Sequence, residues 1–152
     1  MTFAQTGKST LLIDSDLRLG RIHKIFDISN SKGLSNLLIE KNTIEFAEYI
    51  KKCSIDNLYV IPRGTVPPNP SELLNSNNTK RVIEFLRDKF DHIIFDGVPI
   101  NGLPDSLIMA SLVDRVIVVS SANYTKIDAK IAGVVFNRAN QTKRGKYSNY
   151  YE

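Results

Sequence analysis

Five short apolar runs, none of which alternates with polar residues, place the strongest constraint on the fold of this 152-residue chain. The runs are residues 11–13, 58–61, 92–95, 115–119 and 133–136. Continuous runs of branched side chains are typical of strands that are buried on both faces, and such strands occur in parallel sheets. The chain is therefore expected to build a mostly parallel sheet from short strands.

Helix-like stretches lie between these runs. Apolar side chains recur at helical spacing in residues 34–39, 43–51, 78–89 and 103–112. Alternation of strands with helices is the pattern of α/β proteins, in which helices flank a parallel sheet. The fold class that we predict is α/β.

Composition and charge limit the kinds of function that the chain can have. Apolar residues make up 42% of the chain and charged residues 24%, which indicates one globular domain (residues 1–139) followed by a polar tail (residues 140–152). The net charge of +4 is too small to indicate nucleic-acid binding. One cysteine, Cys53, allows no disulfide within the chain, which fits a cytoplasmic protein. No apolar run approaches the roughly 18 residues of a membrane span, so we expect no direct membrane insertion.

Carboxylates follow two of the predicted strands. Asp14 and Asp16 come after the first run, and Asp96 comes after the third. Open parallel sheets bind ligands at the carboxyl ends of their strands, so these side chains are expected at one edge of the sheet. Magnesium binds through one or two carboxylates together with substrate phosphates, and the pattern predicts a Mg²⁺ site there. Aspartates also end strands as turn formers or helix caps, and this alternative stays open.

Three motifs occur in order along the chain. Residues 11–18 (LLIDSDLR) are an apolar run followed by D-x-D-x-R, residues 93–99 (IIFDGVP) are an apolar run followed by D-x-x-P, and residues 66–74 read VPPNPSELL. They resemble the Walker A′ motif, the Walker B motif and the proline loop of the bacterial tyrosine kinases (BY-kinases) of capsular and exopolysaccharide biosynthesis. Asp105, residues 125–126 and residues 133–137 align in the same order, so the resemblance covers nearly the whole chain. The proline loop is specific to that family, whereas partition and septum-placement ATPases share the two aspartate motifs.

The resemblance implies a P-loop NTPase-like fold and a kinase that uses ATP and Mg²⁺. Asp14 and Asp16 would be catalytic residues that help to place Mg²⁺ and polarise the attacking phenol. A phenol has a pKa near 10, so a nearby carboxylate is a sensible proton acceptor. Asp14 and Asp96 would hold the metal, and Arg18 would contact phosphate. A solvated Arg18 at the strand end remains the alternative.

A cluster of tyrosines ends the chain. Tyr147, Tyr150 and Tyr151 resemble the C-terminal phosphoacceptors of the family. Phosphorylation would add about −1.5 to −2 charges per site and could disrupt a contact between subunits. The alternative is a frayed, sticky terminus, which composition alone favours.

The segment Gly7-Lys8-Ser9-Thr10 looks like the end of a phosphate-binding loop, G-x-x-x-x-G-K-[ST]. The first glycine of such a loop would fall at Thr2, and Lys8 leads directly into a predicted strand, whereas this loop must open a helix. The resemblance instead places residues 2–8 at the end of the helix after that loop, with Gly7 just past the helix end. We therefore expect the true Walker A loop, its strand and the oligomerisation helix of the family to be missing, and the fold to be incomplete.

A second gap is expected near the C-terminus. Only residues 121–130 separate the last two expected strands, 116–120 and 131–136, and a parallel crossover usually needs about a dozen residues or more, including a helix. The crossover helix is therefore expected to be missing. We predict that the last strand is absent, displaced or paired antiparallel.

Three functions remain open at this stage. The first, by resemblance, is tyrosine (auto)phosphorylation that regulates capsule or exopolysaccharide synthesis, impaired by the missing loop. It implies self-association and a membrane-spanning activator that holds the protein at the inner face of the membrane. The second is a partition or septum-placement ATPase, and the third is a non-catalytic remnant of the kinase.

Overall fold

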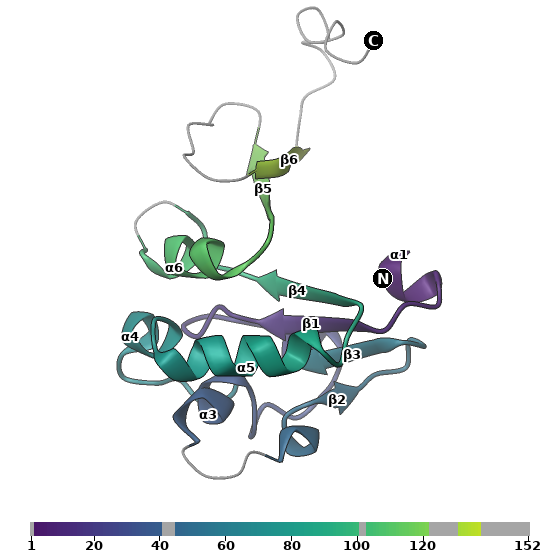
Figure 1. Ribbon diagram of the computed structural model, residues 1–152, viewed down its shortest axis with the longest axis horizontal. Coiled ribbons are helices and arrows are strands. Elements are labelled where there is room, and N and C mark those ends of the chain that lie inside the picture. The colour runs from purple at the N-terminus through teal and green to yellow at the C-terminus, as the bar shows by residue number, and fades with distance from the viewer. Residues whose placement is uncertain (1, 41–44, 101–102, 122–130, 138–152) are drawn as a thin grey trace, which may run out of the picture. The chain divides into compact units, whose positions relative to one another are not determined.

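The computed structural model describes residues 2–40, 45–100, 103–121 and 131–137 (Figure 1). The chain divides into two compact units, residues 1–112 and residues 113–152, and each is described by itself. Within the described ranges no helix is both long enough and apolar enough to cross a bilayer. The predicted boundary at residue 139 stays a prediction, because residues 138–152 lie outside the described part.

A four-stranded sheet forms the centre of the first unit. Its strands are β1 (Thr10–Asp14), β2 (Lys51–Lys52), β3 (Leu58–Ile61) and β4 (His92–Asp96), in the order β2-β3-β1-β4. β1 runs parallel to both β3 and β4, and β2 pairs antiparallel with β3 at one edge. The mostly parallel sheet is confirmed, and so are the predicted strands that became β1, β3 and β4.

Seven helical segments lie in the described residues of the first unit. They are α1 (Thr2–Gln5), α2 (Ile22–Ile25), α3 (Leu34–Ile39), the 3-10 helix η1 (Phe46–Glu48), α4 (Pro70–Leu74), α5 (Asn77–Arg87) and α6 (Asp105–Leu112). The predicted helices at 34–39, 78–89 and 103–112 are confirmed to within a few residues. α5 starts at a Ser76 cap, whose hydroxyl accepts a hydrogen bond from the Thr79 amide, and it buries Val82 and Leu86 in the core.

The predicted helix at residues 43–51 is wrong where the structure describes it. Residues 46–48 form only the single turn η1, and Lys51 then pairs with Val60 in the sheet. The ring of Phe46 stacks on that of Phe85 of α5, with centroids 3.8 Å apart. Apolar spacing alone favoured a helix, but pairing with β3 and packing on α5 decide the local conformation.

The segment that imitates a phosphate-binding loop lies between a helix end and a strand, as predicted. α1 ends at Gln5, and the Gly7 amide donates to the Ala4 carbonyl at 3.1 Å. Gly7 has a φ of +83°, the left-handed conformation that closes helices and favours glycine. β1 then begins at Thr10, so no helix opens after Lys8 and the segment cannot present helical amides to a phosphate.

Where the structure describes the second unit, at residues 113–121 and 131–137, it forms two strands, β5 (Val116–Ser121) and β6 (Ile131–Asn137). They pair in parallel, with Val118 opposite Val134. The predicted absence or antiparallel pairing of the last strand is therefore wrong. A six-residue strand is about 20 Å long, and the connection over residues 122–130 can span roughly 30 Å when extended, so it is long enough to return without a helix.

Candidate functional site

The two predicted metal ligands meet at one end of the sheet. Asp14 ends β1, Asp96 ends β4, and the two residues are register partners in the parallel pairing. Adjacent strands lie about 4.8 Å apart, so the two carboxylates leave the sheet as neighbours. Ser15 extends the pairing of β1 with β4 by one residue, because its amide and its hydroxyl both donate to the Asp96 carbonyl, at 2.9 Å and 2.7 Å. The predicted convergence of the two strand ends is confirmed.

The Asp14 carboxylate is buried and only half satisfied. Its side chain is 0% exposed, and its Oδ2 accepts a hydrogen bond from the Ile22 amide at 3.1 Å. Its Oδ1 has no hydrogen-bond partner among the described residues. Burial raises the pKa of Asp14 to about 6, against the lowering effect of the Ile22 amide, and the charges of Asp96 and Asp16 raise it further. A buried acceptor without a partner is rare in proteins, and a cation at Oδ1 would satisfy it.

Gly20 makes room for this carboxylate. A Cβ on residue 20 would lie 2.1 Å from Asp14 Oδ1, far inside contact distance. The Gly20 amide donates to the Asp16 carbonyl at 2.9 Å, which folds the loop back over the strand end. Glycine is thus required here for close approach to Asp14, a role that the sequence pattern did not reveal.

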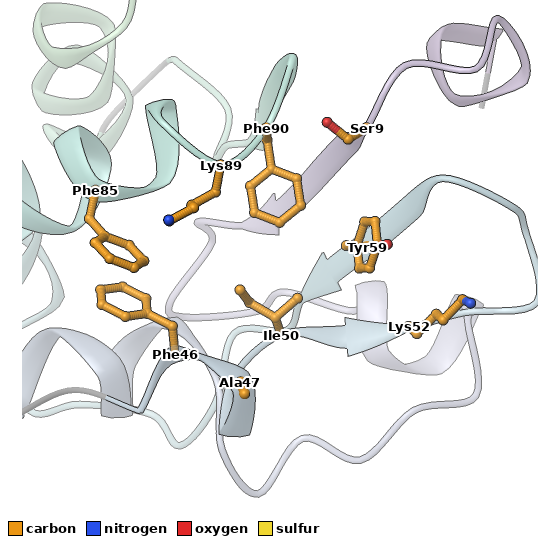
Figure 2. A pocket seen from close by; sticks show the side chains of 9 residues that line it. All are labelled: Ser9, Phe46, Ala47, Ile50, Lys52, Tyr59, Phe85, Lys89 and Phe90. Carbon is orange, nitrogen blue, oxygen red and sulfur yellow. The ribbon is translucent and has the colours of Figure 1, made fainter.

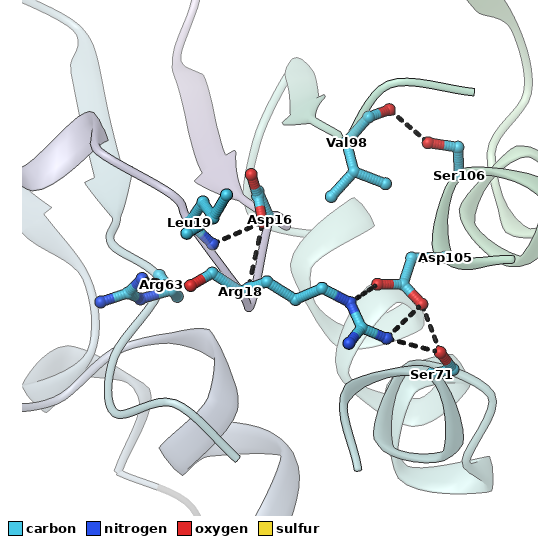
Figure 3. Close-up of polar contacts among 8 residues, drawn as sticks. All are labelled: Asp16, Arg18, Leu19, Arg63, Ser71, Val98, Asp105 and Ser106. Carbon is cyan, nitrogen blue, oxygen red and sulfur yellow. Dashed lines mark hydrogen bonds and ion pairs between the residues drawn. The ribbon is translucent and has the colours of Figure 1, made fainter. Parts of the chain in front are cut away.

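Asp16 shapes the loop after β1. Its Oδ1 accepts from the amides of Arg18 and Leu19, at 3.0 Å and 2.8 Å (Figure 3). This is the turn-forming role that the sequence left open for these aspartates. Asp16 also lies near enough to raise the pKa of both Asp14 and Asp96 through its charge. One carboxylate therefore holds the turn and adds to the negative field of the site.

Arg18 is held by two residues that sequence reasoning gave no role. Its Nε donates to Asp105 Oδ2 at 2.9 Å, and its Nη2 donates to the Ser71 hydroxyl at 3.1 Å. The Ser71 hydroxyl in turn donates to Asp105 Oδ1. Figure 3 shows the guanidinium pointing away from Asp16 and toward these two side chains. The predicted contact of Arg18 with phosphate stays a prediction.

Asp105 is ionised although it is buried. Its side chain is 1% exposed. Burial opposes ionisation, but the hydrogen bonds from Arg18 and Ser71, with the charge of Arg18, outweigh it and hold the pKa of Asp105 below its ordinary value. Ser71 lies in the proline loop and Asp105 was one of the aligned positions, yet no local pattern indicated that the two would meet.

The donor set fits magnesium better than a metal that needs a complete protein cage. Across the part of the chain that the structure describes, no group of three or more His, Cys, Asp or Glu side chains could hold an ion. Asp14 and Asp96 would supply two carboxylates, and magnesium takes its remaining ligands from water and substrate phosphates. Burial raises the pKa of Asp96 too, with the charge of Asp16 as a second cause, so a nearby cation would favour the charged form of both carboxylates.

An apolar groove occupies the other end of the strands. Its volume is about 500 Å³, and its walls include Ser9, which precedes β1, and Phe90, which precedes β4 (Figure 2). The rings of Tyr59 and Phe90 meet edge to face at 5.4 Å. Because the groove adjoins the amino ends of β1 and β4, it is separate from the carboxylates at their carboxyl ends, and we do not assign the nucleotide to it.

Comparisons with known proteins identify the family of the chain. An AAA domain family model matches residues 1–136. The putative tyrosine-protein kinase CapB of Staphylococcus aureus is 36% identical over 99% of this chain and 71% of its own. The crystal structure of the chimerical protein CapA2B2 superposes with a TM-score of 0.81 at 31% identity, over 90% of this chain and 66% of that one. The cell division ATPase MinD of Pyrococcus furiosus, at 24% identity and a TM-score of 0.60, shares the fold alone.

A mostly parallel sheet with helices at its faces and two carboxylates at adjacent strand ends defines a P-loop NTPase-like protein of the AAA-domain class. Within that class, the chain belongs to the bacterial tyrosine kinases of the capsule family. It spans 71% of the CapB relative and 66% of the CapA2B2 chain.

Proposed function

We propose that this chain takes part in ATP-dependent phosphorylation of tyrosine in capsular or exopolysaccharide biosynthesis. The observation that carries the proposal is the register pair Asp14 and Asp96, together with Asp14 Oδ1, which is buried and has no hydrogen-bond partner among the described residues. Together with the family membership, this arrangement supports a Mg²⁺–ATP site rather than a structural turn alone.

Each carboxylate has a stated task in the proposal. Asp14 and Asp96 would hold Mg²⁺, which when bound neutralises charge on the transferred phosphoryl group. Asp16 would lie beside the attacking phenol and accept its proton. Tyr147, Tyr150 and Tyr151, the proposed phosphoacceptors, lie outside the described residues.

Two partners complete the proposal. The resemblance implies a membrane-spanning activator of polysaccharide export, and this contact would hold the protein at the inner face of the membrane. It also implies self-association, through which the tail of one copy would reach the site of another. Both partners would be tested by co-purification of the tagged chain from its host membranes, with and without detergent.

Incubation of the chain with γ-labelled ATP and Mg²⁺ tests the function directly. Label on the tail tyrosines that disappears in Asp14→Asn and Asp96→Asn supports the kinase. Asp56→Asn, a change at an exposed aspartate just before β3, at the amino ends of the strands and not at the carboxyl ends, is the matched control and should retain full labelling. Release of phosphate without labelled tyrosine would indicate an ATPase of the partition type. Absence of nucleotide binding would indicate a non-catalytic remnant.

A further inference from the structure

Three segments that are distant in sequence meet at the buried Asp105 carboxylate. Arg18 comes from the loop after β1, Ser71 from α4 and Asp105 from the first turn of α6. The positions of Arg18 and Asp105 differ by 87 residues, and those of Ser71 and Asp105 by 34. Both carboxylate oxygens are used, because Oδ2 accepts from Arg18 and Oδ1 accepts from Ser71.

Arg18 is held at its main chain as well as at its side chain. Its carbonyl accepts a hydrogen bond from Nη1 of Arg63, which follows β3, at 3.0 Å. Its amide donates to Asp16 Oδ1. The position of Arg18 therefore sets the position of the Asp16 carboxylate, and with it the turn that returns to Gly20 beside Asp14.

We propose that Asp105 and Ser71 are positioning residues for the candidate site: they hold Arg18, and Arg18 holds the turn that carries Asp16 and returns to Gly20 beside Asp14. Neither residue is assigned to touch metal, nucleotide or phenol. This inference rests on the proposed function, because the position of the turn affects function only if the carboxylates bind a metal ion. The rival interpretation is an ion pair that merely joins α4 and α6 to the body of the first unit.

Amide hydrogen exchange separates the two interpretations without any ligand. If Ser71 and Asp105 position the turn, Ser71→Ala should speed exchange at the amides of Arg18 and Leu19, because the turn then opens at a lower free energy. Exchange in β1 should not change. Ser71→Thr keeps the hydroxyl and should restore the slow rate. Equal exchange in the wild type and Ser71→Ala would overturn the proposal.

Binding of Mn²⁺ alone, followed by electron paramagnetic resonance of the free ion, connects the turn to function. Ser71→Ala and Asp105→Asn should weaken Mn²⁺ affinity about tenfold. Leu86→Ala, a core change on α5, should lower the melting temperature and leave affinity unchanged. If Asp105→Asn fails to fold, Ser71→Ala is the milder variant that decides the outcome.

The possible failures are distinguishable. If Asp14→Asn abolishes Mn²⁺ uptake but Ser71→Ala leaves it intact, the positioning role is overturned while the proposed function stands. If the wild type binds no Mn²⁺ and Mg²⁺–ATP does not raise its melting temperature, the proposed function fails. In that case, the amide exchange rates at Arg18 and Leu19 still test whether Ser71 positions the turn, because they need no ligand.

Discussion

Asp14 and Asp96 end two adjacent parallel strands in the same register, and Ser15 locks that register by donating twice to the Asp96 carbonyl. The pairing brings two negative charges together at the carboxyl edge of the sheet, where one of them is fully buried. Such a pair opposes folding unless a cation or a proton relieves it. In the metal-free chain, the burial of Asp14 and its repulsion with Asp96 lower the stability of the fold. The metal ion that we propose would relieve this cost when it binds.

The stability of the chain should depend on pH through Asp14. The folded-state pKa of about 6 lies above the ordinary value of 3.8, so the folded chain binds the proton more tightly than the unfolded chain does. This destabilisation is fully present above pH 6 and is relieved as the pH falls toward 4. The shift corresponds to about 3 kcal/mol. In urea titrations, the free energy of unfolding of Asp14→Asn should exceed that of the wild type by most at pH 7 and by least near pH 4.

Asp56→Asn is the control for that series and should follow the wild type at every pH. Parallel stability profiles for Asp14→Asn and the wild type between pH 4 and pH 7 would contradict the assignment of the raised pKa to Asp14.

Gly20→Ala should push the Asp14 carboxylate out of place. The new Cβ would lie 2.1 Å from Asp14 Oδ1, so the variant should lose about 1–3 kcal/mol of stability, as overpacked sites do. Gly97→Ala is the matched control, since its nearest neighbours would be 3.9 Å away, and it should be close to neutral.

A double variant tests the cause of that loss. In an Asp14→Ala background the clash has no partner, and Gly20→Ala should cost less than about 0.5 kcal/mol in denaturant unfolding. A loss that is equally large in both backgrounds would mean that the backbone at residue 20, and not the carboxylate, requires glycine.

Removal of Arg18 should leave Asp105 buried without its ion-pair partner. Breaking a wholly buried pair costs about 3–5 kcal/mol, and since the Arg18 side chain is 36% exposed we expect Arg18→Ala to lose about 2–3 kcal/mol. The exposed pair Lys32–Glu48 provides the comparison, and Lys32→Ala should lower the free energy of unfolding far less than Arg18→Ala does. Urea unfolding of Arg18→Ala, Asp105→Asn and the double variant measures the coupling free energy between the two side chains. A coupling free energy near zero would mean that Arg18 acts only as a solvated side chain.

Magnesium with ATP should raise the melting temperature of the wild type. A ligand that binds the folded state at 100 times its dissociation constant stabilises it by about 2.7 kcal/mol. A thermal-shift titration should show this gain for the wild type and lose it for Asp96→Asn, because a metal ligand is removed. A Ca²⁺ titration serves as the ion control, and an equal shift in the Asp96→Asn variant would place the ligand elsewhere.

The strands and most helices were predictable because their signals are local. Apolar runs at 58–61 and 92–95 became β3 and β4, and helical spacing at 34–39 became α3. The prediction failed at residues 46–51, where contacts with β3 and α5 outweigh a local helical pattern. The predicted absence or antiparallel pairing of β6 was wrong too, because the usual length of a crossover was taken as a minimum.

The sequence by itself determined the α/β class and the family, and it placed Asp14 and Asp96 at strand ends, because apolar periodicity and short motifs are written in neighbouring residues. Only the tertiary structure decided that Gly20 clears space for Asp14 and that Ser71 and Asp105 meet Arg18. The physical reason is distance along the chain: these contacts are made when the core packs segments together, and no local pattern encodes which polar groups packing will bring into reach.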